Sequence, residues 1–177
     1  MDATELTLFE IWGSKHPDNR AKIRKHLYTQ LRDLGDTTTH FSRVLGLGGP
    51  PSSDHYSISV SHSDSLGGYV LLKKPQLIGL DIEPTDRVTD SVIKRLGYES
   101  WLSSAPAGVL FTALEATYKC LSGSAIIKVL SELQISSCDI LDKDLYEIKI
   151  LNPKSSQIAS VLSRKEHNHW ISIAKSG

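Results

Sequence analysis

The stretch Leu77-Ile78-Gly79-Leu80-Asp81-Ile82-Glu83 is rich in apolar residues, and Pro84 ends it. This pattern predicts a short β-strand. Two similar runs precede it. Residues 56–60 alternate large apolar residues with serines, and residues 68–72 are mostly apolar. Because only short connections separate the three runs, we expect an antiparallel meander of three strands.

Outside this region, hydrophobic periodicity predicts helices over 18–34, 90–96 and 106–121, and strands over 5–11, 145–151, 157–162 and 169–174. Gly35 follows the first helix as a C-terminal cap. A helix followed by three strands thus occurs twice. We predict a pseudo-duplicated α+β fold of two similar halves, residues 1–84 and 85–177, each with a main helix and a three-stranded antiparallel sheet. An active site is expected at their interface.

The composition is that of a soluble protein. With 177 residues, 40% of them hydrophobic, the chain can bury a full core. Lys plus Arg total 20 and Asp plus Glu total 20, so no overall charge favours nucleic acid. No stretch approaches the roughly 20 apolar residues of a membrane helix, and the acidic start over residues 1–5 is unlike a signal peptide. We expect a cytoplasmic monomer without membrane or nucleic-acid partners.

Cysteine and histidine spacing does not indicate a zinc site. Cys120 and Cys138 lack both a metal-site spacing and the partners of a disulfide framework, so we expect two free thiols. His167 and His169 have no third and fourth ligand at a suitable spacing. We expect these two histidines at the surface.

Asp81 and Glu83 are candidate metal ligands. In a strand their side chains point to one face, while Leu80 and Ile82 point to the other. Two neighbouring carboxylates repel each other unless a cation or donors compensate, and a hard divalent cation is a common solution. For an isolated Asp-x-Glu sequence, an exposed strand end with solvated acids is the more common interpretation.

Two further residues lie on the predicted helix over 106–121. Glu115 and Lys119 are four positions apart and share a face, opposite an apolar stripe that includes Leu114. Taken singly, an ordinary surface ion pair explains them, at about 0.3–0.5 kcal/mol. His62, at the end of its strand, is by itself more typical of a hydrogen-bonded histidine than of a phosphate ligand.

Three segments together resemble a known family. They are Ser59-Val60-Ser61-His62-Ser63, Gly79-Leu80-Asp81-Ile82-Glu83 and Phe111-Thr112-Ala113-Leu114-Glu115-Ala116-Thr117-Tyr118-Lys119. They are similar, in order and spacing, to the three signatures of the 4'-phosphopantetheinyl transferases: a Ser-His-Ser strand end, Gly-x-Asp-x-Glu and Trp-x-x-Lys-Glu-x-x-x-Lys. The resemblance covers roughly residues 18–174, and the two-lobed monomeric branch is the most similar.

The resemblance implies a magnesium-dependent transferase that uses coenzyme A. Asp81, Glu83 and Glu115 would hold Mg²⁺, or Mn²⁺ in its place, together with the pyrophosphate of coenzyme A and water. The serine hydroxyl of an apo acyl or peptidyl carrier protein would attack the phosphate that bears the pantetheine arm, and 3',5'-ADP would leave. Such chemistry depends on positioning and charge neutralisation.

The remaining roles also follow from the resemblance. Glu115 would take the serine proton, directly or through water, and Lys119 would neutralise phosphate on the leaving side. Ser61 and His62 would contact phosphate oxygens of coenzyme A. The carrier protein would present an acidic helix.

The chain departs from the family pattern at three places. Phe111 replaces the usual tryptophan, and Leu114 stands where a lysine usually precedes the glutamate. Gly48-Gly49-Pro50 occupies the place of a Gly-Lys-Pro element whose lysine helps to hold the 3'-phosphate. Because guanidinium groups bind phosphate in a bidentate manner, arginines can replace these lysines. The candidates are Arg20, Arg24 and Arg43.

Two other functions stay open. A degenerate member of the family would bind coenzyme A or a carrier protein without turnover, and an unrelated Mg²⁺ phosphohydrolase would use the same three carboxylates. A serine hydrolase using Ser61, His62 and Asp64 is excluded, because residues so close in one strand and turn cannot form a triad.

Overall fold

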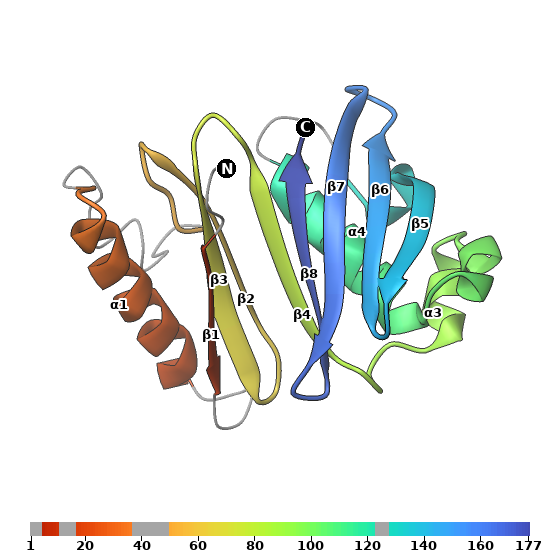
Figure 1. Ribbon diagram of the computed structural model, residues 1–177, viewed down its shortest axis with the longest axis horizontal. Coiled ribbons are helices and arrows are strands. Elements are labelled where there is room, and N and C mark those ends of the chain that lie inside the picture. The colour runs from red at the N-terminus through yellow and green to blue at the C-terminus, as the bar shows by residue number, and fades with distance from the viewer. Residues whose placement is uncertain (1–4, 11–16, 37–49, 123–127) are drawn as a thin grey trace.

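The computed structural model describes residues 5–10, 17–36, 50–122 and 128–177. These residues form an α+β fold with two antiparallel sheets (Figure 1). The helices are α1 (Pro17–Asp33), α3 (Asp90–Arg95) and α4 (Ala107–Leu121), with short 3-10 helices η1 (Glu99–Ser103) and η2 (Leu130–Glu132). The strands are β1 (Glu5–Glu10), β2 (Tyr56–His62), β3 (Leu66–Lys73), β4 (Ile78–Pro84), β5 (Gln134–Asp142), β6 (Leu145–Asn152), β7 (Gln157–Glu166) and β8 (His169–Ser176).

The sheet partners differ from the expected meander. The smaller sheet has the order β1-β3-β2, and the larger has the order β4-β8-β7-β6-β5. The prediction that β2, β3 and β4 form one sheet, and that each sheet has three strands, is therefore wrong. β4 pairs instead with β8 at the end of the chain. Periodicity identified this strand but does not encode which edge it joins.

Strand β5 is absent from the sequence prediction. Its register against β6 shifts between Ile135 and Ser137 and again between Ile140 and Asp142. Such irregularities break the alternation of buried and exposed residues by which a strand is found. The other predicted strands and the three helices are confirmed, and Gly35, with φ of 81°, ends α1 as expected.

The edge of β2 meets the edge of β4 through side chains. Three serines, at positions 57, 59 and 61, point from β2 toward the backbone of β4. Their hydroxyl oxygens accept hydrogen bonds from the N–H groups of Ile78, Leu80 and Ile82 at 3.1, 2.9 and 3.2 Å, respectively. We call these contacts the serine ladder. It connects the two sheets where no backbone ladder is present between β2 and β4.

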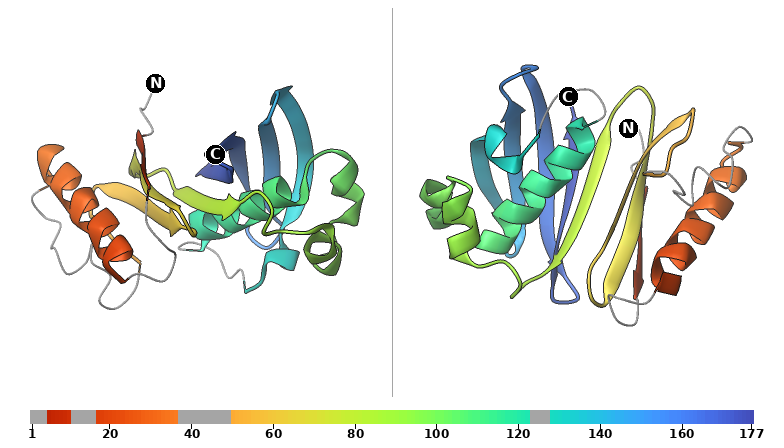
Figure 2. Two further views of the ribbon diagram at one scale, coloured as in Figure 1. Left: turned by 90° about the horizontal axis from the view of Figure 1, so that it is seen from below. Right: turned by 180° about the vertical axis from the view of Figure 1, so that it is seen from behind.

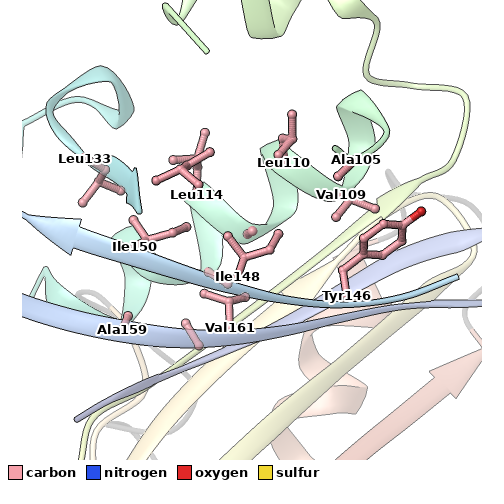
Figure 3. Packing of buried hydrophobic residues seen from close by; sticks show 14 of the residues in the cluster. Ala105, Val109, Leu110, Leu114, Leu133, Tyr146, Ile148, Ile150, Ala159 and Val161 are labelled. Atoms are coloured by element: carbon pink, nitrogen blue, oxygen red, sulfur yellow. The ribbon is translucent and has the colours of Figure 1, made fainter. Parts of the chain in front are cut away.

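Helix α4 covers one face of the larger sheet. Leu110 and Leu114 pack with Ile148, Ile150 and Val161 in the largest buried cluster (Figure 3). Toward β4 the helix comes very close, because a Cβ atom at Gly79 would lie 1.9 Å from the carbonyl oxygen of Ala116. Glycine at position 79 thus allows α4 to rest directly on the strand that carries Asp81.

Helix α1 covers the smaller sheet with three fully buried residues, Ile23, Leu27 and Leu31. Figure 2 shows α1 at one end of the molecule, beside the smaller sheet, and α4 against one face of the larger sheet. A third buried cluster joins the two sheets and includes Val70 of β3 and Leu80 of β4. Residues of the two helices line one cavity together with residues of β2 and β4.

None of the helices within the described ranges is long and apolar enough to cross a membrane.

Candidate active site

Asp81 and Lys119 form the centre of the site. Asp81 is only 5% exposed, and its Oδ1 atom lies 2.7 Å from Nζ of Lys119. The same ammonium group donates to the carbonyl oxygen of Leu80 at 3.1 Å and to the Ser61 hydroxyl at 3.3 Å. The ion pair therefore joins α4 to β4, in place of the Glu115–Lys119 surface pair that helical spacing alone allowed.

The second carboxylate oxygen of Asp81 is buried and has no hydrogen-bond partner among the described residues. An unpaired carboxylate oxygen away from water is unfavourable, so native sites usually supply a donor or a cation. The Oδ2 atom of Asp81 is thus a position where a cation would be stabilising.

Two more carboxylates lie near Asp81. Partial burial and the negative charge of Asp81 raise the pKa of Glu83 and of Glu115. Arg87 opposes this shift at Glu83, with its Nη1 atom 3.0 Å from Oε2. The charge of Asp81 acts on both glutamates, so the three acids share a region of negative potential.

Asp81, Glu83 and Glu115 offer only carboxylate oxygens, which are the ligands that a hard divalent cation prefers. In the parts of the chain that the structure describes, however, no three His, Cys, Asp or Glu side chains come close enough together to hold a metal ion. Lys119, bound to Asp81, holds the positive charge in this arrangement.

A cavity of about 430 Å³ opens beside this cluster. Its basic lining residues come from α1, β2 and α4: Arg20, Arg24, His62 and Lys119. Arg20 and Arg24 are one turn apart on α1, and both line this cavity. Arg24 is almost completely buried, with only 3% of its surface exposed, whereas Arg20 is exposed.

The basic groups affect one another. Partial burial and the charges of Arg20, Lys119 and Arg24 lower the pKa of His62. Burial and the charge of Arg20 likewise lower the pKa of Arg24. A cluster of like charges beside a cavity favours binding of an anion, because the anion relieves their repulsion.

Ser61 is almost completely buried and already has its full set of partners. Its hydroxyl donates to Oδ1 of Asp81 at 3.1 Å and accepts from the N–H group of Ile82 and from Lys119. A hydroxyl has one donor and two acceptor positions, so these three bonds complete it. Ser61 is held as a link between the serine ladder and the Asp81–Lys119 pair, and its contact with phosphate stays a prediction.

The structure also bears on the departures from the family pattern. Leu114 is fully buried and its side chain packs in the core against the larger sheet (Figure 3). It is not among the residues that line the cavity. The leucine therefore removes no charge from the cavity lining. Arg43 and Gly48-Gly49 lie outside the described residues.

Some features of the site were not found from the sequence. Arg87, which pairs with Glu83, closes the turn that begins at Pro84, and it matches no motif. A row of buried hydroxyls also joins α4 to the sheet, with Oγ of Ser172 2.7 Å from Oγ1 of Thr112 and 2.6 Å from Oγ of Ser163. Serines in a strand sequence predict hydroxyl contacts of this kind only when the pairing of the strands is known.

The expectation of two surface histidines is half wrong. His167 is exposed, but His169 is 4% exposed, with Nδ1 2.6 Å from the carbonyl oxygen of His167. His169 precedes Trp170 on β8 and pairs with Pro84 of β4, so the packing of the two strands covers it. Cys120 and Cys138 are free thiols, as expected.

Compared with known proteins, the chain matches none of the family models and none of the curated sequences.

Proposed function

We propose that this protein is a magnesium-dependent 4'-phosphopantetheinyl transferase, which moves the phosphopantetheine arm of coenzyme A to a serine of an apo acyl or peptidyl carrier protein. The observation that carries the proposal is the position of Lys119. It contacts the buried carboxylate of Asp81 and also lines the basic cavity, so an acidic cluster and an anion-binding cavity share one residue.

Asp81, Glu83 and Glu115 are the residues that would hold Mg²⁺. When bound, the ion would neutralise negative charge on the phosphates during transfer. Arg20, Arg24 and His62 would hold the other phosphate groups of coenzyme A in the cavity.

Glu115 is the proposed acceptor of the serine proton. Partial burial and the charge of Asp81 raise its pKa, which makes it a stronger base than a solvated glutamate. Its position on α4, one turn before Lys119, would let one helix present both the base and a phosphate-binding cation.

The test is a transfer assay with isosteric variants. Asp81→Asn and Glu115→Gln should each abolish Mg²⁺-dependent modification of an apo carrier protein while retaining the circular dichroism spectrum of the folded protein. Glu99→Gln, at an exposed position on η1, is the matched control and should keep full activity. Retained activity in Asp81→Asn or Glu115→Gln would remove that residue from the site.

A relative that binds coenzyme A without turnover is the second candidate. One observation favours it: among the described residues, no three acidic side chains come close enough together to hold a metal ion between them. Binding of coenzyme A with no modified carrier, over a panel of carrier proteins, would support this candidate against the first.

A further inference from the structure

Lys119 is bound as completely as an ammonium group can be. An ammonium group has three N–H donors, and Nζ of Lys119 has three acceptors: Oδ1 of Asp81 at 2.7 Å, the carbonyl oxygen of Leu80 at 3.1 Å and Oγ of Ser61 at 3.3 Å. All three acceptors lie on β2 and β4. Lys119 thus occupies a cation position formed by the floor of the site.

This cation position includes a proposed metal ligand. Asp81 uses Oδ1 for Lys119, and its Oδ2 atom is the buried oxygen without a partner among the described residues. A divalent cation bound to Asp81 would stand next to the ammonium group and be repelled by it. The ammonium group and the metal ion therefore compete for one carboxylate.

The ammonium group of Lys119 also has a second position available to it, in the basic cavity. Lys119 lines the basic cavity and its side chain is 31% exposed, and its charge helps to lower the pKa of His62 across that cavity. The four-carbon stem of lysine is flexible, so a small rotation can carry Nζ toward an anion in the cavity.

From these contacts we infer that Lys119 is a built-in counter-ion for Asp81, which it releases to a divalent cation when a phosphate ligand enters the basic cavity. This inference rests on the metal site of the proposed function. Binding of the cation and binding of the phosphate ligand then depend on each other, and by linkage each strengthens the other by the same factor. Lys119 acts here as a positioning residue for the metal site.

The test measures the affinity for Mn²⁺ alone, by the electron paramagnetic resonance signal of the free ion. Lys119→Met should bind Mn²⁺ about tenfold more tightly than the wild type, the scale expected from removing one neighbouring unit charge. Lys119→Gln, which can still donate to Asp81, removes the charge with less change in packing and should behave in the same way. Lys119→Arg keeps the charge and should bind Mn²⁺ as weakly as the wild type.

A second arm adds 3',5'-ADP at saturation, with a protein-free control for metal bound by the nucleotide itself. The nucleotide should tighten Mn²⁺ binding by the wild type by a larger factor than it tightens binding by Lys119→Gln, because only the wild type has an ammonium group to move away from Asp81. Equal factors in the two proteins would contradict the role of Lys119. Unchanged or weaker Mn²⁺ binding in both uncharged variants would overturn the inference, and so would absence of Mn²⁺ binding by every variant.

These outcomes are separate from those of the proposed function. Tighter Mn²⁺ binding by the uncharged variants without carrier modification by the wild type would leave the inference standing and reject the transferase. Carrier modification by the wild type with no change in Mn²⁺ affinity would do the reverse.

Discussion

At the scale of one residue, the pKa of His62 depends on the charges around the cavity. Partial burial and three nearby positive charges hold its pKa below the usual 6.5, so the imidazole is neutral in the ligand-free protein near pH 7. A bound polyanion would reverse the electrostatic part of this effect, since negative charge favours the protonated ring. We expect the pKa of His62, followed by NMR of the imidazole, to rise when 3',5'-ADP is added.

An equal ionic strength of sodium chloride is the control for that titration. No change in the pKa of His62 with saturating nucleotide would mean that the cavity does not hold phosphate. The direction of the pH dependence of stability follows from the same lowered pKa of His62. A lowered histidine pKa contributes stability above pH 6.5 that is lost as pH falls through the folded-state pKa, because the unfolded chain binds the proton first.

At the scale of elements, the serine ladder explains how β4 belongs to one sheet and is bound to another. The N–H group of Leu80 donates to Oγ of Ser59 at 2.9 Å, and both residues are buried. Removing the hydroxyl leaves that N–H without a partner. Ser59→Ala should therefore lower the free energy of unfolding by about 1–3 kcal/mol, measured by urea denaturation.

Ser160→Ala is the matched control, because Ser160 is exposed on β7. Its effect should stay within about 0.5 kcal/mol. Equal effects of the two substitutions would show that the ladder does not stabilise the fold.

Gly79 controls the approach of α4 to β4. A Cβ atom there would lie 1.9 Å from the carbonyl oxygen of Ala116 and 2.7 Å from the amide nitrogen of Cys120, both backbone atoms. Backbone cannot rotate away, so Gly79→Ala should push α4 off the strand and cost about 1–3 kcal/mol or more of stability. It should also weaken Mn²⁺ binding, because Glu115 moves with the helix.

Gly108→Ala, on the same helix, is a control that separates the effect of close packing from an effect on the metal site. Its Cβ would meet the ring of the buried Trp170, with Cδ1 at 2.5 Å, so this substitution also disturbs core packing. We expect a loss of stability with unchanged Mn²⁺ affinity, because Gly108 lies in the first turn of α4, away from Glu115 and Lys119. A Gly79→Ala protein as stable as the wild type in urea would contradict the packing described above.

On the scale of the whole molecule, residues of α1 on the smaller sheet and of α4 on the larger one line the same cavity. Arg20 is exposed at its edge and contributes positive charge near His62. Arg20→Glu should therefore raise the Michaelis constant for coenzyme A about tenfold, the effect of one lost charge contact. Steady-state kinetics of carrier modification measure this change.

Arg32→Glu is the control, because Arg32 is an exposed residue in the last turn of α1 and does not line this cavity. The same Michaelis constant in both variants would exclude α1 from binding coenzyme A.

Much of this organisation could be predicted from local sequence. Periodicity predicted the helices and most strands, and it placed Asp81 on one face of a strand and Lys119 on one face of a helix. These two residues meet in an ion pair in the structure. Local sequence does not predict which residues come into contact from distant parts of the chain. The pairing of β4 with β8 and the burial of Arg24 depend on packing between segments far apart in the chain, which no local pattern encodes.

The position of Leu114 shows the same limit. In the sequence it stands at the site of a lost cation, but its side chain is packed in the core of the larger sheet. The rotation of α4 about its own axis determines which of its residues face the sheet. Contacts between α4 and the strands, such as the close approach at Gly79, fix this rotation.

The most direct test of the transferase proposal is the mass of an apo carrier protein after incubation with this protein, coenzyme A and Mg²⁺. We predict that one phosphopantetheine arm is added to the carrier serine, and that EDTA prevents the addition. An unchanged carrier mass over fatty acid, polyketide and peptide carrier proteins, with the protein folded and Mg²⁺ present, would contradict the proposal.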